Sequence, residues 1–545
     1  MSKFETQIEK ISEWIEKTKF EDIPLHVIEI AKFQTLDIIS AICAGYRSPM
    51  GQKVYLKLKK QNIKGEVMIL PTGEFWTVQN AAYYHAAMIN ALEMDNFSFL
   101  GHLSQSSIGA AWSLSFKNNL SGKDFLLSSI IAQEVSGRLG AYLSSGPLQG
   151  HMRSFIHRIA AAVVVTKIHG CPAPIIANAI AISLSGPEFY MIPSSFSADT
   201  KVTSTSSPTV EGINSGYLAM EGATGPLDLL EHPAGFVAMF SYLNYVPDFW
   251  KRIGTTWVME SISFKYYASC AYAQGPVNAA MTIRNQLSEW NTEKIKNIKV
   301  KSPILSLVME NFSMPHYNSG LNQVNINFST KKSLALAILF GEPNGDFFSE
   351  QDQDQRYREI EALTQKISLH HDWKLSIDMI MGFDKSINNP GYPGVFGMSD
   401  SQKALKRTQK VYQNRSLFEW GDLIQFLSLP KGYLRYLGIR YLNSFSGKYF
   451  KKDKKSHEMD LSKMEFHIGS EITITFNDGS QIKSHCGIPK GFAGDPGKIE
   501  AVLEKYERET VPILGKQKSD SLREIIMHME KMNLRDSMVK IIEIR

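Results

Sequence analysis

The sequence predicts a mainly α-helical protein with a smaller α+β part. Residues 5–260 repeat apolar side chains at helical spacing and are rich in alanine, which lets helices approach closely. After Lys265, short segments alternate apolar and polar residues, as half-buried strands do. The helical pattern returns beyond Pro496. Since 545 residues exceed what one hydrophobic core usually supports, we expect two or three domains.

The helical part begins at the N-terminus, where Ile8 and Ile11 recur at helical spacing. A second helix is expected to start near Pro24 and to end at Gly45, a residue type that commonly follows a helix end. Further helical patterns cover residues 81–93, 124–142, 159–168, 174–183 and 210–220. No GxGxxG motif follows a strand here, so we do not expect a dinucleotide-binding unit.

Strands are predicted in the middle of the chain. Apolar residues alternate with polar ones around Ile298, Ile326 and Ile474, and the last of these segments leads into Asn477-Asp478-Gly479, a strong hairpin turn. Helical segments 333–340 and 356–367 lie between them. A Gly/Pro-rich loop at 384–400 then opens a basic, tyrosine-rich stretch that resembles an insertion.

Composition and charge exclude several classes of protein. The formal charge of +5 is small for this length, and the basic run 448–455 is interpreted as a solvated loop rather than a nucleic-acid site. The four cysteines lie far apart, which argues against a zinc or iron–sulfur site and for a reducing compartment. No signal peptide or spanning run of about 18 apolar residues is found. We therefore expect a cytoplasmic protein with no membrane or nucleic-acid partner.

The most informative stretch is the loop at 91–107. It carries Glu93, Asp95 and His102 within ten positions, with Phe97 and Phe99 between them. Partial desolvation by such aromatic neighbours moves carboxylate and imidazole pKa values toward neutrality, which suits proton transfer. The alternative is an ordinary helix end whose polar groups are solvated.

Three further sites could carry chemistry, and the first two of them could bind an anion. His151 and Arg153 precede a helix, where free backbone N–H groups favour negative charge. Lys201 stands in a Ser/Thr-rich loop and could hold a carboxylate as a point charge. Lys265 lies among aromatic residues at the presumed domain boundary, where clefts form and where burial would lower the lysine pKa. For the first site the alternative is an ordinary polar loop, and for Lys201 it is a solvated lysine.

The order of these segments resembles the MmgE/PrpD family. The likeness runs through residues 23–45, 90–111, 149–170, the Lys201 loop, 211–236, 261–283, 328–342 and 472–485. Together these segments cover most of residues 5–345 and 465–545. The ordered set is specific, although no single motif in it is.

The resemblance implies a particular domain arrangement and chemistry. A helical domain would form from residues 1–262 and 496–545, and an α+β lid domain from residues 263–495 with an insertion at about 385–465. The active site would lie between them in a homodimer. The implied chemistry is that of a lyase or isomerase for small di- or tricarboxylic acids, with neither a metal nor an organic cofactor.

The resemblance also assigns roles to residues. His102 matches a loop histidine proposed as a proton donor, and His151 matches a second active-site histidine. Asp95 and Glu93 match acidic positions, while Lys201 and Lys265 match lysines that hold substrate carboxylates. A polycarboxylate needs several cations, and a carbanion or enolate needs a nearby acid, so these assignments are chemically consistent.

The chain also departs from the family pattern. Asn96 and Phe97 replace an acid and a hydroxyl residue, and Lys332 stands where the family commonly has tyrosine. The insertion is unusual as well. The expected pocket is less cationic and more aromatic than the family pattern implies. We therefore expect the substrate, rather than the fold, to differ from that of the family.

We therefore expect a cofactor-independent lyase or isomerase that acts by proton transfer on a small carboxylic acid. In this hypothesis Lys201, Lys265 and Arg153 fix a carboxylate, and Asp95 or His151 removes a proton. His102 then delivers a proton to carbon or to a leaving hydroxyl; the predicted substrate contacts also include Glu93 and Lys332. The substrate would be a citrate- or aconitate-like acid, or a bulkier, less acidic compound of a biosynthetic pathway. The alternative is a catalytically silent scaffold that binds a partner through the insertion.

Overall fold

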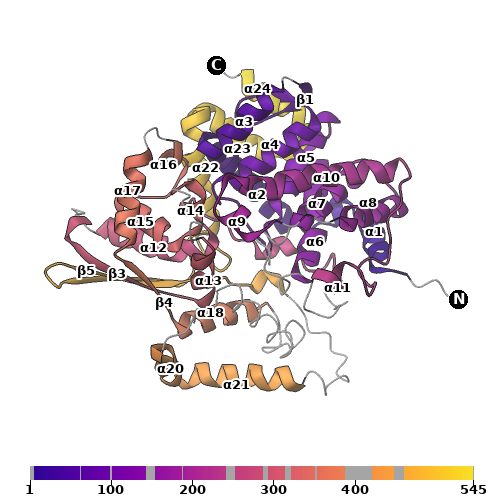
Figure 1. The fold of residues 1–545 in the computed structure, drawn as a ribbon. Helices are drawn as coiled ribbons and strands as arrows, with labels where there is room; N and C mark the ends of the chain where they lie inside the picture. Colours follow the sequence, from indigo (N-terminus) through magenta and orange to yellow (C-terminus); the bar gives the residue numbers. More distant parts are fainter. Residues whose placement is uncertain are drawn as a thin grey trace.

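The computed structural model describes residues 5–61, 63–98, 101–142, 154–186, 188, 190–240, 252–286, 292–313, 321–349, 353–386, 420–446 and 460–543. Helices dominate this part of the chain, and its strands form one sheet of two strands and one of four (Figure 1). The prediction of a mainly α fold with a small α+β part is confirmed.

The first helical part runs to residue 261. It contains α1 (Gln7–Lys17), α2 (Leu25–Arg47), α3 (Pro49–Lys60), α4 (Val78–Ala91), α5 (Ser104–Lys117), α6 (Gly122–Tyr142), α7 (Ser154–Ile168), α8 (Ala173–Ser185), α9 (Ile192–Phe196), α10 (Thr203–Met220) and α11 (Phe236–Phe240). Short 3-10 turns, η1 (Phe20–Asp22), η2 (Asp199–Val202) and η4 (Val258–Ser261), and a hairpin of β1 (Lys64–Met68) and β2 (Phe75–Trp76) complete it.

Local chemistry sets several of these helix starts. The Thr6 side chain accepts from the Glu9 N–H while the Glu9 carboxylate accepts from the Thr6 N–H, a capping box that starts α1. Ser48 caps α3, and Thr77 caps α4. The cap at Thr77 matters most for function, because α4 leads directly into the loop with the two acids.

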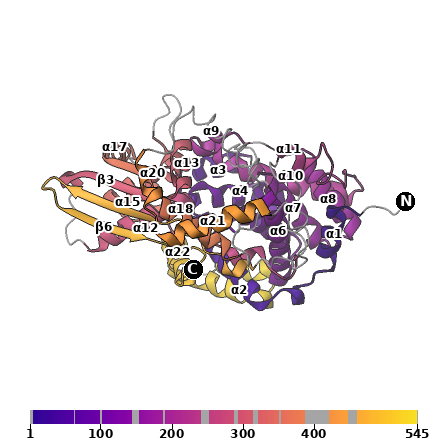
Figure 2. The ribbon, with the colours of Figure 1, turned by 90° about the horizontal axis from the view of Figure 1, so that it is seen from below.

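The middle part is built on a four-stranded sheet of order β4-β3-β5-β6. Its strands are β3 (Ile295–Ser302), β4 (Ile367–His371), β5 (Ser470–Phe476) and β6 (Gln481–Cys486). β3 and β4 are parallel and the other pairs are antiparallel, with β5 and β6 joined by the predicted turn at Asn477–Gly479. The sheet lies at the end of the molecule opposite the N-terminus (Figures 1 and 2).

The middle part also contains helices. They are α12 (Ala271–Gln286), α13 (Ile304–Phe312), α14 (Gln323–Phe328), α15 (Thr330–Phe340), α16 (Gly345–Ser349), α17 (Gln353–Thr364), α18 (Trp373–Asp384), α20 (Trp420–Leu427) and α21 (Lys431–Ser446), with η5 (Thr292–Lys294) and η6 (Leu461–Lys463). Figure 2 shows α20 and α21 across the lower face of the molecule. Gln425 donates to Asp372 (2.6 Å) and Tyr433 to Asp378 (2.8 Å), which fastens these two helices to the α18 region.

The prediction of a strand around Ile326 is wrong, because these residues form α14. All six residues of α14 are buried, so the apolar–polar alternation does not separate a buried face from a solvent face. Its polar members are buried amides: Asn327 donates to the Ala268 carbonyl (2.6 Å), and Gln323 donates to that of Ala91 (2.8 Å). The Asn322 side chain caps the helix by accepting from the Asn325 N–H.

The C-terminal helices return to the first helical part. They are α22 (Lys498–Leu514), α23 (Lys516–Met527) and α24 (Leu534–Glu543), with η7 (Met529–Lys531) between the last two. α22 packs against α2, and Lys32 of α2 pairs with Glu530 at 2.7 Å. Figure 1 shows the yellow C-terminal helices beside the indigo ones. The domain bounds at 262 and 495, the lid role and the insertion bounds stay predictions; residues 387–419 and 447–459 lie outside the described residues.

None of the described helices combines the length and the apolar composition needed to cross a membrane.

Gly45 does not follow a helix end, as the sequence predicted, but lies inside α2, which continues to Arg47. An added Cβ would overlap the backbone carbonyl of Met88 on α4, so glycine permits the close approach of these two helices. We expect Gly45→Ala to lower the free energy of unfolding by about 1–3 kcal/mol. Gly432→Ala in α21 is the matched control, because its Cβ meets nothing within 4 Å. Urea denaturation of both variants tests this; equal midpoints would contradict it.

Candidate active site

The loop between α4 and α5 brings its two acids and its histidine together. α4 ends at Ala91, and Glu93 adopts a left-handed conformation (φ 57°), which turns the chain sharply. Glu93 and Asp95 are 2% and 0% exposed. The interpretation of this loop as a solvated helix end is therefore wrong for the two carboxylates.

Lys265 joins both acids. Its Nζ atom lies 2.8 Å from Oε2 of Glu93 and 2.9 Å from Oδ1 of Asp95, and its side chain is fully buried. Two backbone hydrogen bonds between Phe97 and Ser263 hold the Lys265 segment against the loop (3.0 and 2.8 Å). Residues that are about 170 positions apart thus form one compact ionic cluster.

Lys201 closes the other side of this cluster. It belongs to η2, and its Nζ atom lies 3.1 Å from Oε1 of Glu93. The same ammonium donates to the carbonyl of Asn90 and lies over the ring of Phe328. Lys201 is fully buried. The two lysines are therefore paired with the chain's own acids.

His102 is the member of the cluster that reaches the surface. Its Nδ1 atom lies 2.5 Å from Oδ2 of Asp95, which also accepts from Nε2 of Gln105 at 3.0 Å. The His102 side chain is 27% exposed. The ring of Phe97 lies beside it, and Phe466 and Phe492 pack on Phe97, with centroids 5.0 and 5.3 Å away. This aromatic wall follows from the replacement noted at position 97.

Burial and charge compete in setting the pKa values of this cluster. Burial alone would raise the pKa of Glu93, but the ammonium groups of Lys201 and Lys265 hold it below its usual range. In the same way Lys265 and His102 outweigh burial at Asp95 and lower its pKa. Both acids are therefore ionised at neutral pH.

The two lysines respond differently. Burial would lower the pKa of Lys265, but Asp95 and Glu93 outweigh it and raise the value, so the sequence-based expectation of a lowered pKa is wrong. At Lys201 burial prevails over the attraction of Glu93, and the pKa is lowered. The difference arises because Lys265 contacts two carboxylates and Lys201 contacts one.

A second buried ion pair lies next to the cluster. Asp37 of α2 and Lys505 of α22 are 2.7 Å apart and at most 1% exposed. Sequence reasoning missed both residues. The available signal was a lone acid in the apolar run around Asp37, which is unusual unless the acid is paired. Nothing in the sequence indicated a partner 468 positions away.

The other three predicted residues fall into two groups. His151 and Arg153 lie outside the described residues. Lys332 is buried in α15, and burial lowers its pKa while the charges that act on it are those of Glu361 and Glu310. Within the described residues, Lys332 makes no contact with the cluster of Glu93, Asp95, His102, Lys201 and Lys265.

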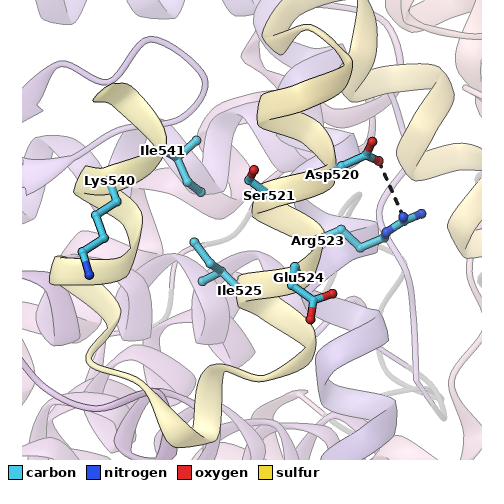
Figure 3. Close-up of a pocket in the computed structure, with 7 residues that line it drawn as sticks. All are labelled: Asp520, Ser521, Arg523, Glu524, Ile525, Lys540 and Ile541. Atoms are coloured by element: carbon cyan, nitrogen blue, oxygen red, sulfur yellow. Dashed lines mark ion pairs between the residues drawn. The ribbon is translucent and has the colours of Figure 1, made fainter. Parts of the chain in front are cut away.

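Three pockets elsewhere on the described surface are not lined by residues of the cluster. One of about 660 Å³ lies between α23 and α24 (Figure 3), where Asp520 and Arg523 form an ion pair at 3.5 Å. Smaller ones lie near Trp14 and near Pro71. Within the described residues, no group of three or more His, Cys, Asp and Glu side chains is placed to hold a metal ion.

Comparison with known proteins identifies a family for the first part of the chain. Residues 9–245 match the MmgE/PrpD N-terminal domain. This range contains the acids, the loop histidine and Lys201, but not Lys265 or Lys505.

Three similar proteins carry the words cis-aconitate decarboxylase in their names. Cis-aconitate decarboxylase of Aspergillus terreus is 24% identical over 308 residues, which cover 53% of this chain and 63% of that protein. The human protein of the same name is 24% identical over 313 residues, or 54% and 63%. A cis-aconitate decarboxylase-like protein of Aspergillus oryzae is 22% identical over 310 residues, or 53% and 64%. The chain thus spans less than two thirds of the length of each relative.

Proposed function

We propose that this chain, whose residues 9–245 match the MmgE/PrpD N-terminal domain, is a divergent member of that family and a lyase of dehydratase or decarboxylase type, or an isomerase. It would act by proton transfer on a small carboxylic acid and without a cofactor. The names of the relatives, which are 24% identical to this chain, support the decarboxylase type. A citrate- or aconitate-like acid, or a divergent biosynthetic substrate, remains the proposed substrate class.

The observation that carries this proposal is the position of Asp95 between His102 and Lys265. Because Asp95 is ionised and accepts from Nδ1 of His102, the imidazole is held in the tautomer whose Nε2 exchanges the proton. Lys265 keeps Asp95 in its charged form. A partly exposed imidazole on a buried, permanently charged partner is suited to general acid–base catalysis.

The proposed step can be written for either reaction. In a dehydration, a base removes the proton on carbon, the C–O bond breaks, and protonated His102 gives its proton to the departing hydroxyl, so that an alkene and water form. In a decarboxylation, the C–C bond breaks to release carbon dioxide, and the electron pair left on carbon takes the proton from His102. His151, the second predicted histidine, is our proposed base, and Arg153 our proposed contact for a substrate carboxylate.

For the two lysines we propose a first role beside the substrate binding that the resemblance implies. Both are fully buried and paired, so a substrate carboxylate would have to displace Glu93 or Asp95 to reach them. We therefore propose that Lys201 and Lys265 act first by holding the two acids ionised and in place. Substrate binding by these lysines, by Glu93 and by Lys332, a homodimeric state and a cytoplasmic location stay predictions.

The direct test is product analysis. We expect the purified full-length chain to convert at least one of cis-aconitate, 2-methylcitrate and citrate to a product lighter by carbon dioxide or by water, detected by mass spectrometry. Heat-denatured protein is the control for spontaneous decay. The lack of any product with these acids, together with stable capture of another protein through residues 385–465, would favour the scaffold alternative and contradict the proposal.

A further inference from the structure

The buried pair of Asp37 and Lys505 makes contacts with the site that a simple structural ion pair does not need. An ammonium group has three hydrogens to donate. Those of Lys505 go to Oδ1 of Asp37 at 2.7 Å, to the backbone carbonyl of Met94, and to the backbone carbonyl of Lys265 at 3.0 Å. All three acceptors belong to different segments of the chain.

Two of these acceptors flank the reactive cluster. Met94 lies between Glu93 and Asp95, and the third acceptor is the carbonyl of the residue that pairs with both acids. One ammonium group therefore holds the backbone on both sides of the contact between Asp95 and Lys265. Hydrogen bonds from a charged donor are stronger than those from a neutral one, so this is a firm anchor.

The loop needs such an anchor because of its local conformation. A left-handed conformation at a residue with a side chain is unfavourable and persists only when its surroundings enforce it. Glu93 has this conformation, and the Met94 carbonyl that follows it accepts from Lys505. The bridge between Phe97 and Ser263 ties the same two segments a few residues further along. The bridge and Lys505 together hold the loop with the two acids at a fixed distance from the Lys265 segment.

Asp37 is itself held in place. Its second oxygen accepts from Nδ2 of Asn96 at 2.8 Å, and the Asn96 carbonyl oxygen accepts from Gln34 at 2.9 Å. Asn96 is the residue that replaces an acid in the family pattern. The amide supplies a donor where a carboxylate would have placed a second negative charge against Asp37.

We propose that Lys505 is a positioning residue of the active site, which sets the geometry of Asp95 and Lys265, and through Asp95 that of His102, by holding the Met94 and Lys265 carbonyls. The proposal rests on the function proposed above. Lys505 does not touch the reacting atoms, since it is 1% exposed and its hydrogens are all used.

The test removes the anchor without leaving a buried charge unpaired. Asp37→Asn/Lys505→Met eliminates both charges and keeps an acceptor for Asn96, and such paired replacements are often tolerated. We expect kcat to fall by about tenfold to a hundredfold, because a displacement of about 1 Å has effects of that size. KM is expected to stay within about threefold, because the loss lies in the chemical step rather than in binding.

The matched control is Lys32→Met/Glu530→Gln. It removes another pair of a lysine and a carboxylate that joins α2 to the C-terminal segment, but it does not contact the cluster. We expect unchanged kcat and KM there. Asp37→Asn/Lys505→Gln is the conservative variant; its amide can still donate to one carbonyl, so we expect an intermediate kcat. If Asp37→Asn/Lys505→Met fails to fold, the kcat of Asp37→Asn/Lys505→Gln provides the test. Wild-type kcat in a folded Lys505 variant would overturn the inference and leave the proposed function intact.

A second measurement does not depend on turnover. Amide hydrogen exchange at Phe97 and Ser263, which bond to each other, is expected to accelerate in Asp37→Asn/Lys505→Met or its glutamine counterpart but not in the control. If the wild-type chain turns over no acid, the proposed function fails while this exchange still decides whether Lys505 holds the two segments together. Unchanged exchange at both amides would overturn the inference.

Discussion

Replacement of His102 by glutamine is expected to lower kcat by about a hundredfold to ten-thousandfold. His102 is the partly exposed group of an otherwise buried cluster, and Asp95 orients it for proton exchange. A glutamine amide can still donate to Asp95, so the buried carboxylate keeps a hydrogen bond and the chain stays folded. Initial rates with the acid that the wild type converts measure the effect.

The control for His102→Gln is His26→Gln. His26 also contacts a carboxylate, Oε1 of Glu260 at 2.8 Å, but its side chain is 58% exposed and, within the described residues, it has no hydrogen bond or ion pair with the cluster. We expect this variant to keep the wild-type rate. Full activity of His102→Gln, or an equal loss in both variants, would contradict the role assigned to His102.

Replacement of Lys265 by methionine is expected to lower the free energy of unfolding by about 3–5 kcal/mol at neutral pH. Lys265 is fully buried, and its loss leaves Asp95 without a lysine partner and Glu93 with Lys201 only. An uncompensated charge in the interior is costly because neither water nor a counter-ion stabilises it. Urea denaturation at constant pH measures the loss.

The loss in the free energy of unfolding caused by Lys265→Met is expected to become smaller as the pH falls from 7 toward 5. In the wild type the pKa values of Glu93 and Asp95 are held low, so these acids stabilise the fold above their unfolded pKa near 4 and cease to do so as the pH drops through their folded values. In Lys265→Met, burial raises the pKa of Asp95, and protonation at mildly acid pH then relieves the buried charge. A loss that does not depend on pH would contradict this explanation.

The control for Lys265→Met is Lys301→Met. Lys301 pairs with Glu471 at 2.8 Å on the sheet surface, where the two side chains are 34% and 40% exposed. Surface pairs of this kind contribute about 0–1 kcal/mol. We expect a small change in this variant, with little dependence on pH between 7 and 5.

Part of the site was predictable from the sequence because its residues lie close together along the chain. The loop of Glu93, Asp95 and His102 was recognisable from the spacing of these residues alone. Lys265 was recognisable because it lies where the sequence changes from helical periodicity to apolar–polar alternation. The helical character of residues 5–260 followed from periodicity, and the β5–β6 hairpin from its turn residues. Local patterns carry this kind of information well.

Other features depend on partners that a local pattern does not contain. The sign of the Lys265 pKa shift is set by two acids about 170 positions away, so burial alone predicted it wrongly. The residues of α14 are all buried, so their apolar–polar alternation did not mark a half-buried strand. The roles of Asp37 and Lys505 require knowing that α22 returns to α2. In each case tertiary contacts override the local signal.

The return of α22 to α2 also determines when this site is completed during protein synthesis. A ribosome-bound chain that has emerged only as far as η4 already contains Asp37, Asp95, and Glu93 with its partner Lys201, but not Lys265 and Lys505, which pair with Asp95 and Asp37 in the finished fold. Domains tend to fold as their segments emerge, and an acid without its cation resists burial. We therefore expect Asp37 and Asp95 to stay hydrated until these two lysines have been synthesised, so that the contacts around Asp95 form only after translation has passed Lys505.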